Sequence, residues 1–276
     1  MHCSMEGTVM VRPTRSQKDV RSYSFIARAQ VMIYAALLLI PMVSGGQEQR
    51  DPAHSWDYGK ATGPKHWSEL SPEFTACKGG HQQSPIDIRE TQKADLPPIL
   101  FDYKPAPLHI IDNGHTIEVD YPPGSSISVG AKTYQLLQFH FHHPSEEHIR
   151  GKISELEVHL VHSDSQGNKV VVAVLINLRQ NNDFLQSIFS HVPHQKDTEE
   201  SMDVIVDATK LLPDGHSYYT FPGSLTTPPC TENVTWFVLK NPVEASASQI
   251  KMFAKIHNND ARPIQALSGR GVLESQ

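Results

Sequence analysis

The chain has 276 residues, of which 38% are hydrophobic and 20% are charged, and this mixture excludes collagen, a coiled coil and wholesale disorder. The formal net charge of -6 argues against a general electrostatic affinity for nucleic acid. The sequence contains 16 histidines, a large number of a side chain that often binds metals and titrates near neutral pH.

The first 46 residues have the pattern of a secretory signal. Residues 1–30 contain five basic and two acidic side chains, and an apolar run follows at 31–43. This run is too short to cross a bilayer comfortably, and the small residues at 44–46 suit a signal peptidase. We expect residues 1–46 to be removed and the protein to be secreted, with no stable membrane insertion afterwards. Because the basic stretch is long, an uncleaved signal anchor is the alternative.

Export changes the interpretation of the cysteines. Cys3 leaves with the signal, and Cys77 and Cys230 remain as an even pair in an oxidising compartment. A disulfide is then favoured over two free buried thiols. Asn233 begins an Asn-Val-Thr sequon for N-glycosylation, but the sequon runs directly into an apolar segment, which lowers its expected accessibility.

The rest of the chain has mostly the pattern of strands. Short apolar or alternating segments are separated by turn sequences such as Asn113-Gly114 and Pro122-Pro123-Gly124. The predicted strands cover 108–111, 116–121, 126–129, 134–142, 156–162, 170–178 and 234–239. The segment 170–178 is continuously apolar and β-branched, which predicts a strand buried on both faces.

Two segments are predicted to be helical. They are Asp183–Ser190, with Asp183 placed to cap it, and Ser246–Ile256, where apolar residues recur at helical spacing. No repeat or low-complexity linker divides the chain. We therefore expect one domain within 47–276, with a core from about 54 to 268, built on a large, mainly antiparallel sheet.

Alternation along one predicted strand places metal-binding side chains together. Residues two apart on a strand point to the same face, so Gln138, His140 and His142 share one face, and Glu157 and His159 share a face of a second strand. If the two strands are neighbours, three imidazoles converge. Three histidines with one open position are the donor set of a catalytic zinc site, and Gln138 and Glu157 could fix the rings. The alternative is a pair of exposed surface histidines.

Several short sequence motifs occur in the order and approximate spacing of one known family. They are Tyr58-Gly-Lys60, Gly63-Pro-Lys-His-Trp67, Gln83-Ser-Pro-Ile-Asp87, Asn113-Gly-His115, Gln138-Phe-His-Phe-His142, Glu157-Val-His-Leu-Val-His162, Gly223-Ser-Leu-Thr-Thr-Pro-Pro229 and Arg262-Pro263. From His54 to about Leu267 the chain resembles the α-class carbonic anhydrases. The resemblance implies a single, mainly β (α+β) domain. Its central, twisted, mostly antiparallel sheet has about ten strands and short peripheral helices, with zinc at the bottom of a conical cleft.

The resemblance also assigns roles to particular residues. The implied zinc ligands are His140, His142 and His159. A second group matches positions that line the proton path or the apolar wall for carbon dioxide. Its members are Tyr58, Asn113, Val161, Val174, Leu225, Thr226, Thr227 and Trp236.

Three further roles follow from the resemblance. Thr226 resembles the gatekeeper threonine, which accepts a hydrogen bond from zinc-bound hydroxide and donates one to a buried carboxylate. Glu147 matches that carboxylate, and His115 resembles the proton shuttle. Without the resemblance, these residues would be an ordinary turn threonine, a solvated loop acid and an exposed turn histidine.

The function implied by the resemblance is the zinc-dependent, reversible hydration of carbon dioxide to bicarbonate and a proton. Zinc-bound hydroxide would be the nucleophile, and sulfonamides or anions would inhibit at the zinc. The resemblance also implies the Cys77–Cys230 disulfide of exported family members. The alternatives are a catalytically silent carbonic-anhydrase-like binding module and an acidic biomineral matrix protein.

Three positions depart from the commonest family pattern. His143 stands where a tryptophan usually follows the second ligand, Phe221 stands where a tyrosine is often found, and Glu118, close to His115, stands where a neutral amide is often found. A carboxylate at Glu118 is expected to favour the charged form of His115 and to slow proton release.

Overall fold

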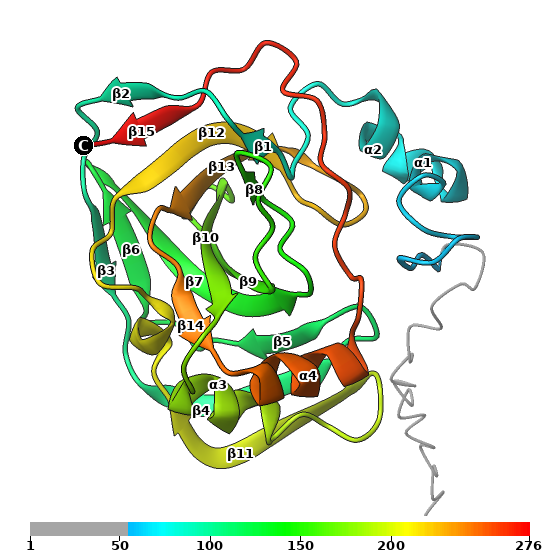
Figure 1. The fold of residues 1–276 in the computed structure, drawn as a ribbon, viewed down its shortest axis with the longest axis vertical. Coiled ribbons are helices and arrows are strands. Elements are labelled where there is room, and N and C mark those ends of the chain that lie inside the picture. Colours follow the sequence, from blue (N-terminus) through cyan, green and yellow to red (C-terminus); the bar gives the residue numbers. More distant parts are fainter. Residues whose placement is uncertain (1–54) are drawn as a thin grey trace, which may run out of the picture. The chain divides into compact units, whose positions relative to one another are not determined.

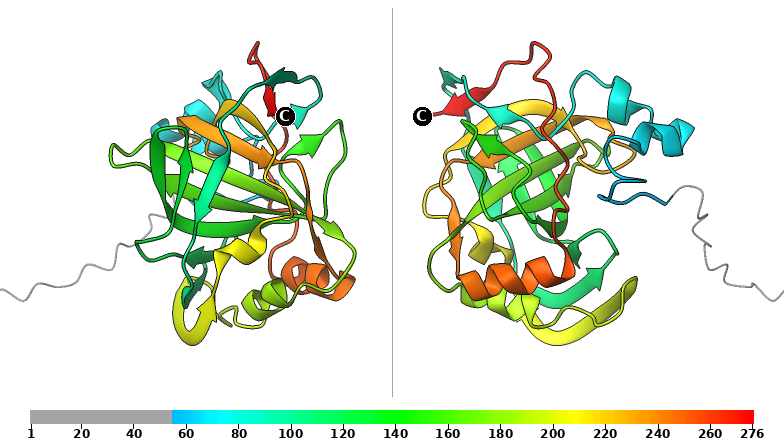
Figure 2. Two further views of the ribbon diagram at one scale, coloured as in Figure 1. Left: turned by 90° about the vertical axis from the view of Figure 1, so that its left-hand side faces the viewer. Right: turned by 45° about the vertical axis from the view of Figure 1, so that its right-hand side comes forward.

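A computed structural model describes residues 55–276, and the predicted signal at 1–46 lies outside this part of the chain. Within the described residues, one twisted sheet of 13 strands dominates the fold (Figure 1; Figure 2). Ten of these strands form its continuous path, in agreement with the expected number. In spatial order they are β11 (Thr198–Val206), β4 (Ala106–Asp112), β5 (Ile117–Asp120), β7 (Lys132–His142), β9 (Leu156–Ser163), β10 (Lys169–Leu178), β13 (Glu232–Leu239), β12 (Tyr218–Ser224), β15 (Leu273–Ser275) and β2 (Gln92–Ala94).

The remaining strands attach to this path or lie outside it. β3 (Ile99–Asp102) pairs with β6 (Ser126–Val129), which pairs with β7, and β14 (Val243–Ala245) pairs with β10. β1 (Asp87–Ile88) and β8 (His148–Ile149) form a separate two-stranded sheet. Most pairs in the large sheet are antiparallel, but β10–β13, β10–β14 and β15–β2 are parallel, so the sheet is mixed.

The central strand β10 shows how the sheet buries both faces. Its side chains alternate between two apolar clusters, because successive residues of a strand point to opposite faces. Val172 and Val174 belong to the larger cluster, whereas Val171 and Ala173 pack in the smaller one with Trp236. The prediction of a strand buried on both faces is therefore confirmed.

Helices α3 (Asp183–Phe189) and α4 (Ala247–Ile256) lie together on the larger cluster (Figure 1). Gln249 joins them, because its side-chain amide hydrogen-bonds to the backbone N–H and carbonyl of Asn182. Ser246 caps α4 in a reciprocal capping box with Gln249. The residue that caps α3 is Asn182, whose backbone is extended and whose Oδ1 accepts from two helix N–H groups. The prediction of Asp183 as the cap was wrong, because Asp183 is already helical.

Short helices cover other parts of the sheet's rim. They are α1 (Trp67–Leu70), η2 (Pro72–Phe74), α2 (Ala76–Gly79) and η3 (Ala208–Leu211). Trp67 of α1 and Cys77 of α2 are buried in a third, small cluster with Cys230. No helix in the part of the chain that the structure describes is long and apolar enough to span a membrane.

Candidate active site

Three histidine side chains converge on the face of β7 and β9. The two strands are antiparallel neighbours, and their register sets His140 directly opposite His159. The ring centroids lie 5.1 Å apart for His140 and His142, 5.2 Å for His140 and His159, and 4.6 Å for His142 and His159. One ring nitrogen from each histidine lies within 4.8 Å of the others. The strand alternation therefore gathers the three imidazoles as the sequence predicts.

One nitrogen of each ring faces an oxygen atom on the side away from the other rings. Nδ1 of His140 is 2.8 Å from Oε1 of Gln138, and Nδ1 of His142 is 2.9 Å from the carbonyl oxygen of Asp260. Nε2 of His159 is 3.5 Å from Oε1 of Glu157. The opposite nitrogen of each histidine is thus left for a shared ion.

The donor set fits zinc. Nε2 of His142 is buried and has no hydrogen-bond partner among the described residues, which is unfavourable unless the nitrogen binds a metal or water. Three imidazole nitrogens suit Zn²⁺, and partners on the outer nitrogens are the usual way in which such ligands are oriented.

Burial and charge act differently on the three rings. Burial lowers the pKa of His140 well below its usual value, and burial with repulsion from His159 lowers the pKa of His142 to about 4. These two rings are therefore neutral, which is the form that binds a metal. Burial also acts to lower the pKa of His159, but the surrounding carboxylates outweigh it and raise the value to about 10. The site around His159 therefore favours positive charge.

The carboxylate beside Thr226 is Glu146. The Thr226 side chain acts on Glu146 and lowers the pKa of its carboxyl group, and Oε1 of Glu146 accepts the backbone N–H of Arg262 at 2.7 Å. Burial raises the pKa of Glu146 to about 7, while His159, Thr226 and Arg262 act to lower it. Glu147 faces His159 instead, with Oε2 3.7 Å from Nε2.

The prediction that Glu147 would partner Thr226 therefore does not hold. Glu146 and Glu147 are adjacent in the irregular segment between β7 and β8, and their carboxyl groups have different neighbours. The sequence contains no periodicity there that could distinguish them. Glu146 is the residue that the sequence reasoning missed.

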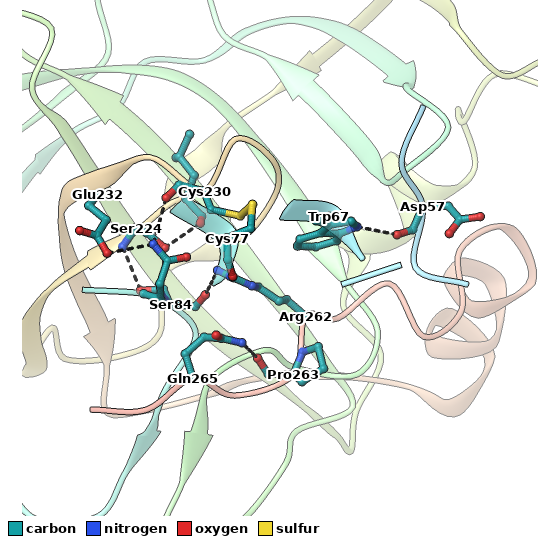
Figure 3. Close-up of a disulfide and its surroundings, with 12 residues drawn as sticks. Asp57, Trp67, Cys77, Ser84, Ser224, Cys230, Glu232, Arg262, Pro263 and Gln265 are labelled. Carbon is teal, nitrogen blue, oxygen red and sulfur yellow. Dashed lines mark hydrogen bonds between the residues drawn. A yellow bond between two sulfur atoms is a disulfide. The ribbon is translucent and has the colours of Figure 1, made fainter. Parts of the chain in front are cut away.

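The backbone N–H of Arg262 donates to this carboxylate, and its side chain reaches Cys77 of the disulfide (Figure 3). Its guanidinium donates to the carbonyl oxygens of Ser84 at 2.7 Å and Cys77 at 2.8 Å, and it lies 5.7 Å from the centroid of the Trp67 ring. Cys77 and Cys230 form the predicted disulfide, which joins α2 to the turn after Thr226 (Figure 3).

The turn that carries Thr226 and Thr227 is fixed by the same disulfide. The backbone N–H of Cys230 donates to the carbonyl oxygen of Thr227 at 2.8 Å, and that of Leu225 donates to Thr231 at 2.9 Å. Thr226 is buried and Thr227 is half-buried. The turn is therefore held at both ends next to the histidines.

An apolar surface lies beside the histidines, but its members differ from the prediction in one place. Val161 and Trp236 belong to one cluster, and Leu225 packs against it. Val171 joins them, because it pairs directly with Val161 across β9 and β10.

Val174 lies on the other face of the sheet, in the larger cluster. Its assignment to the apolar wall was wrong because residues 171 and 174 differ by an odd number of positions and so point to opposite faces. A continuously apolar strand gives no sequence pattern that separates the faces. The register with Val161 is the signal that identifies Val171.

His115 lies on the turn between β4 and β5. Oδ1 of Asn113 accepts the backbone N–H of His115 at 3.0 Å and that of Thr116 at 2.9 Å, which shapes this turn. The His115 ring is half-buried and stacks on Trp56, with centroids 3.7 Å apart and an interplanar angle of 8°. The hydroxyl of Tyr58 is buried, and burial raises its pKa well above the usual value.

Glu118 hydrogen-bonds behind His140. Its Oε2 accepts from Nε2 of Gln138 at 3.2 Å and from Nδ2 of Asn113 at 3.4 Å. Burial, followed by repulsion from Asp120, raises the pKa of Glu118 to about 7. The contacts of Glu118 thus extend the support of the His140 ring through Gln138, a role that the sequence did not suggest.

Three other singled-out residues have structural contacts. Phe221 is buried and lies parallel to Trp236, with ring centroids 6.1 Å apart. The backbone N–H of His143 donates to Oδ1 of Asp260 at 2.6 Å. Asn233 is exposed. The apolar segment that follows it therefore does not make the sequon inaccessible to a glycan.

The fold and the site define a class of protein: a single β-sheet domain with three convergent histidines that can hold a catalytic metal. The model of the eukaryotic-type carbonic anhydrase family matches residues 62–276. The chain therefore belongs to the eukaryotic-type carbonic anhydrase family, and its enzyme class is carbonic anhydrase.

Individual relatives agree with this membership. A carbonic anhydrase of Nostoc sp. is 40% identical over 227 residues, which cover 80% of this chain and 86% of that protein. The structure of an α-carbonic anhydrase from Thermovibrio ammonificans with sulfanilamide gives a TM-score of 0.77 at 40% identity, covering 80% of this chain and 99% of that one. Dioscorin DB3L of Dioscorea polystachya is 33% identical over 247 residues, covering 86% of this chain and 90% of that protein.

Proposed function

We propose that the protein is a secreted zinc enzyme that hydrates carbon dioxide reversibly to bicarbonate and a proton. The observation that carries this proposal is the convergence of His140, His142 and His159, each with its outer nitrogen facing an oxygen atom. Family membership and the similarity to a carbonic anhydrase solved with sulfanilamide support the reaction and inhibition at the same site.

The three histidines would hold the ion. Bound Zn²⁺ would lower the pKa of a water molecule to about 7, a figure for which carbonic anhydrase itself is the reference case, and so supply the nucleophile. We infer that the Thr226 hydroxyl donates to Glu146, whose Oε1 also accepts the N–H of Arg262. Because its only proton is used in the hydrogen bond to Glu146, the Thr226 oxygen acts as an acceptor and can orient the nucleophile.

The apolar surface of Val161, Val171, Leu225 and Trp236 provides the place for carbon dioxide. This substrate has no charge and no hydrogen-bond donor, so an apolar wall binds it without competing with water for polar groups. We assign Thr227, which follows Thr226 on the same turn and is half-buried, as a contact for bicarbonate.

The proton released by hydration must leave the site. His115 is half-buried on a turn, and an imidazole exchanges protons near neutral pH, so we assign it as the shuttle. Asn113 shapes this turn through its Oδ1, and Tyr58 contributes a buried hydroxyl to the same region.

Secretion and processing complete the proposal. The Cys77–Cys230 disulfide fits an oxidising compartment, and residues 1–46 have the composition of a signal. We assign 47–276 as the catalytic domain and Asn233, with its exposed side chain, as a glycan acceptor. Mass spectrometry of the secreted protein would reveal the first residue, the absence of free thiols and any sugar.

The competing function is binding without catalysis. The similarity to dioscorin DB3L favours it, as does the similarity to a dioscorin structure solved with ascorbate (TM-score 0.74, 30% identity). The three histidines and the Thr226–Glu146 contact favour the enzyme.

Stopped-flow hydration of carbon dioxide by the oxidised, zinc-loaded protein tests the proposal. We expect a rate far above that of buffer, abolished by a chelator or a sulfonamide. One zinc bound per chain without any rate would favour the binding function. No bound zinc would refute the metal site itself.

A further inference from the structure

The turn that carries His115 is joined to a residue far along the chain. Asp112 is the last residue of β4 and is only 3% exposed. Its Oδ1 accepts the backbone N–H of Gly114 at 3.0 Å and lies 2.9 Å from Nε2 of His257. A carboxylate only accepts hydrogen bonds, so Nε2 of His257 is the donor. His257 therefore binds the same oxygen that shapes the turn just before His115.

The end of α4 fixes the position of His257. The backbone N–H of His257 donates to the carbonyl oxygen of Phe253 at 3.0 Å and closes the last turn of the helix. Phe253 and Ile250 of the same helix are buried in the larger apolar cluster. His257 itself is buried, so water is largely excluded from its contact with Asp112. This contact links the turn to a helix that is anchored in the core.

The carboxyl group of Asp112 depends on this contact. In the described part of the chain, its hydrogen-bond donors are the N–H of Gly114 and the ring of His257. A buried carboxylate that loses a donor is strongly disfavoured and rotates toward water where it can. Such a rotation would also release the N–H of Gly114. Without His257, we therefore expect the backbone of the turn to shift.

A shift of the turn would move His115 directly. Oδ1 of Asn113 accepts the backbone N–H of His115 at 3.0 Å and that of Thr116 at 2.9 Å, so residues 112–116 form one hydrogen-bonded turn. The His115 ring stacks on Trp56 with centroids 3.7 Å apart. The ring is thus placed by Trp56 and by the backbone of its turn together. Proton relay depends on the placement of the relaying group, so a displaced ring is expected to work less well.

We propose that His257 is a positioning residue for proton exit, because it holds Asp112 and, through Asp112, the turn that places the His115 ring. The inference rests on the proposed shuttle role of His115. The conversion of carbon dioxide at the three histidines does not involve this turn. Loss of the contact should therefore slow proton exit and leave the conversion of carbon dioxide unchanged.

A second route from His257 to the active site has to be separated from this one. Three residues further along the chain, the carbonyl oxygen of Asp260 lies 2.9 Å from Nδ1 of His142. A change at His257 that acted through Asp260 would disturb a metal-binding ring. It would lower zinc content and kcat/KM, whereas a change that acts through the turn lowers turnover alone.

The experiment uses the zinc-loaded, full mature protein and varies the reach of residue 257. His257→Gln places an amide N–H close to the position of Nε2 and should keep the contact with Asp112. His257→Asn is one methylene shorter and loses the contact, and His257→Leu removes the donor. His191→Leu is the matched control. His191 also follows a helix, α3, is half-buried, and has Nδ1 2.6 Å from a backbone carbonyl oxygen, that of Ser187.

Stopped-flow hydration in dilute buffer should show turnover about 3- to 10-fold lower for His257→Asn and His257→Leu, with kcat/KM and zinc content unchanged. Added imidazole should restore both variants, because it carries the proton in place of His115. His257→Gln and His191→Leu should match the wild type. Hydrogen exchange of the Gly114 amide, followed by NMR, should be about 10-fold faster in the two slow variants. If His257→Leu does not fold, the comparison of Asn with Gln decides.

The other outcomes count against the inference. Equal turnover of all variants, where His115→Ala is slow, would refute the inference and leave the shuttle role intact. A fall in zinc content or kcat/KM in His257→Asn would show that residue 257 acts through Asp260, and would also overturn it. A lower melting temperature with unchanged turnover and Gly114 exchange would leave His257 a role in stability alone, which refutes the inference. If His115→Ala is as fast as the wild type, the shuttle role and the inference fail together.

Discussion

At the scale of single residues, the direction of one hydroxyl matters most. Thr226 can accept a hydrogen bond at the nucleophile only while its own proton points to Glu146. Glu146 is an obligate acceptor when ionised, and its Oε1 accepts the backbone N–H of Arg262. Glu146 thus sets the direction in which the Thr226 hydroxyl donates its hydrogen bond.

Replacing Glu146 with glutamine should remove this fixed direction. The amide can donate as well as accept, so the Thr226 hydroxyl is free to rotate and point its proton elsewhere. We expect Glu146→Gln to lower turnover by about 10²- to 10³-fold, the usual loss for a misdirected transition-state hydrogen bond, with zinc content unchanged. Stopped-flow rates normalised to bound zinc provide the measurement. A greater loss of turnover in Glu147→Gln than in Glu146→Gln would contradict the assignment.

His115 should matter only for the exit of the proton. Because this step follows the conversion of carbon dioxide, His115→Ala should lower turnover in dilute buffer and leave kcat/KM nearly unchanged. Added imidazole should restore turnover by carrying the proton instead. Equal turnover of the two proteins in dilute buffer would exclude His115 as the shuttle.

His162 predicts a pH effect on stability. It is fully buried, its Nε2 lies 2.9 Å from the Tyr103 hydroxyl, and burial lowers its pKa to about 3. The unfolded chain, with a pKa near 6.5, takes up the proton first, so stability is retained above about pH 6.5 and is lost as pH falls.

Between pH 7.5 and 5.0, this residue should cost about 2 kcal/mol of unfolding free energy. Urea unfolding of the metal-free wild type and of His162→Gln at both pH values measures the effect, since the variant lacks this titration. Equal pH dependence of the two proteins would mean that His162 is protonated in the folded state.

At the scale of secondary-structure elements, alternation predicts faces only where polar and apolar residues alternate. It placed His140 and His142 correctly because polar and aromatic side chains alternate along β7. It could not orient β10, whose central residues are all apolar and buried. β11 was missed because acidic residues and a bulge after Met202 interrupt its pattern, and β12 because it contains Pro222 and Gly223.

The two faces of β10 can be separated by one matched pair of substitutions. Val171→Phe should crowd the apolar wall beside Val161 and lower kcat/KM by about 10-fold or more, whereas Val174→Phe should not. Both changes overpack a core and should cost about 1–3 kcal/mol of stability. Zinc-normalised stopped flow and urea unfolding measure the two effects. A larger catalytic loss in Val174→Phe would reverse the assignment of the faces.

At the scale of the whole molecule, the histidines and their supports have different origins in the sequence. The three histidines lie within 20 residues of one another, on neighbouring strands, so strand alternation alone could gather them. The residues that complete the site, including Thr226, Asp260 and Arg262, come from distant segments. Only the resemblance pointed to Thr226, and nothing in the local pattern could show that Glu146 is its partner.

The Cys77–Cys230 disulfide should make a large contribution to stability. It joins residues 153 positions apart, and the chain-entropy estimate for such a loop is about 5 kcal/mol. We expect Cys77→Ser with Cys230→Ser to lose up to this amount in urea unfolding, and reduction of the wild type to have the same effect. A loss below about 1 kcal/mol would mean that the rest of the fold holds these segments together without the bond.

The pairing of β15 with β2 bears on how the chain acquires its fold during synthesis. β2 (Gln92–Ala94) has β15 (Leu273–Ser275) as its partner within the described sheet, and β15 also joins it to β12. A ribosome makes β2 about 180 residues before β15. That side of the sheet therefore remains open until about 180 further residues have been made. This delay suits the proposed export, because translocation through a narrow channel requires a chain that has not yet closed its sheet.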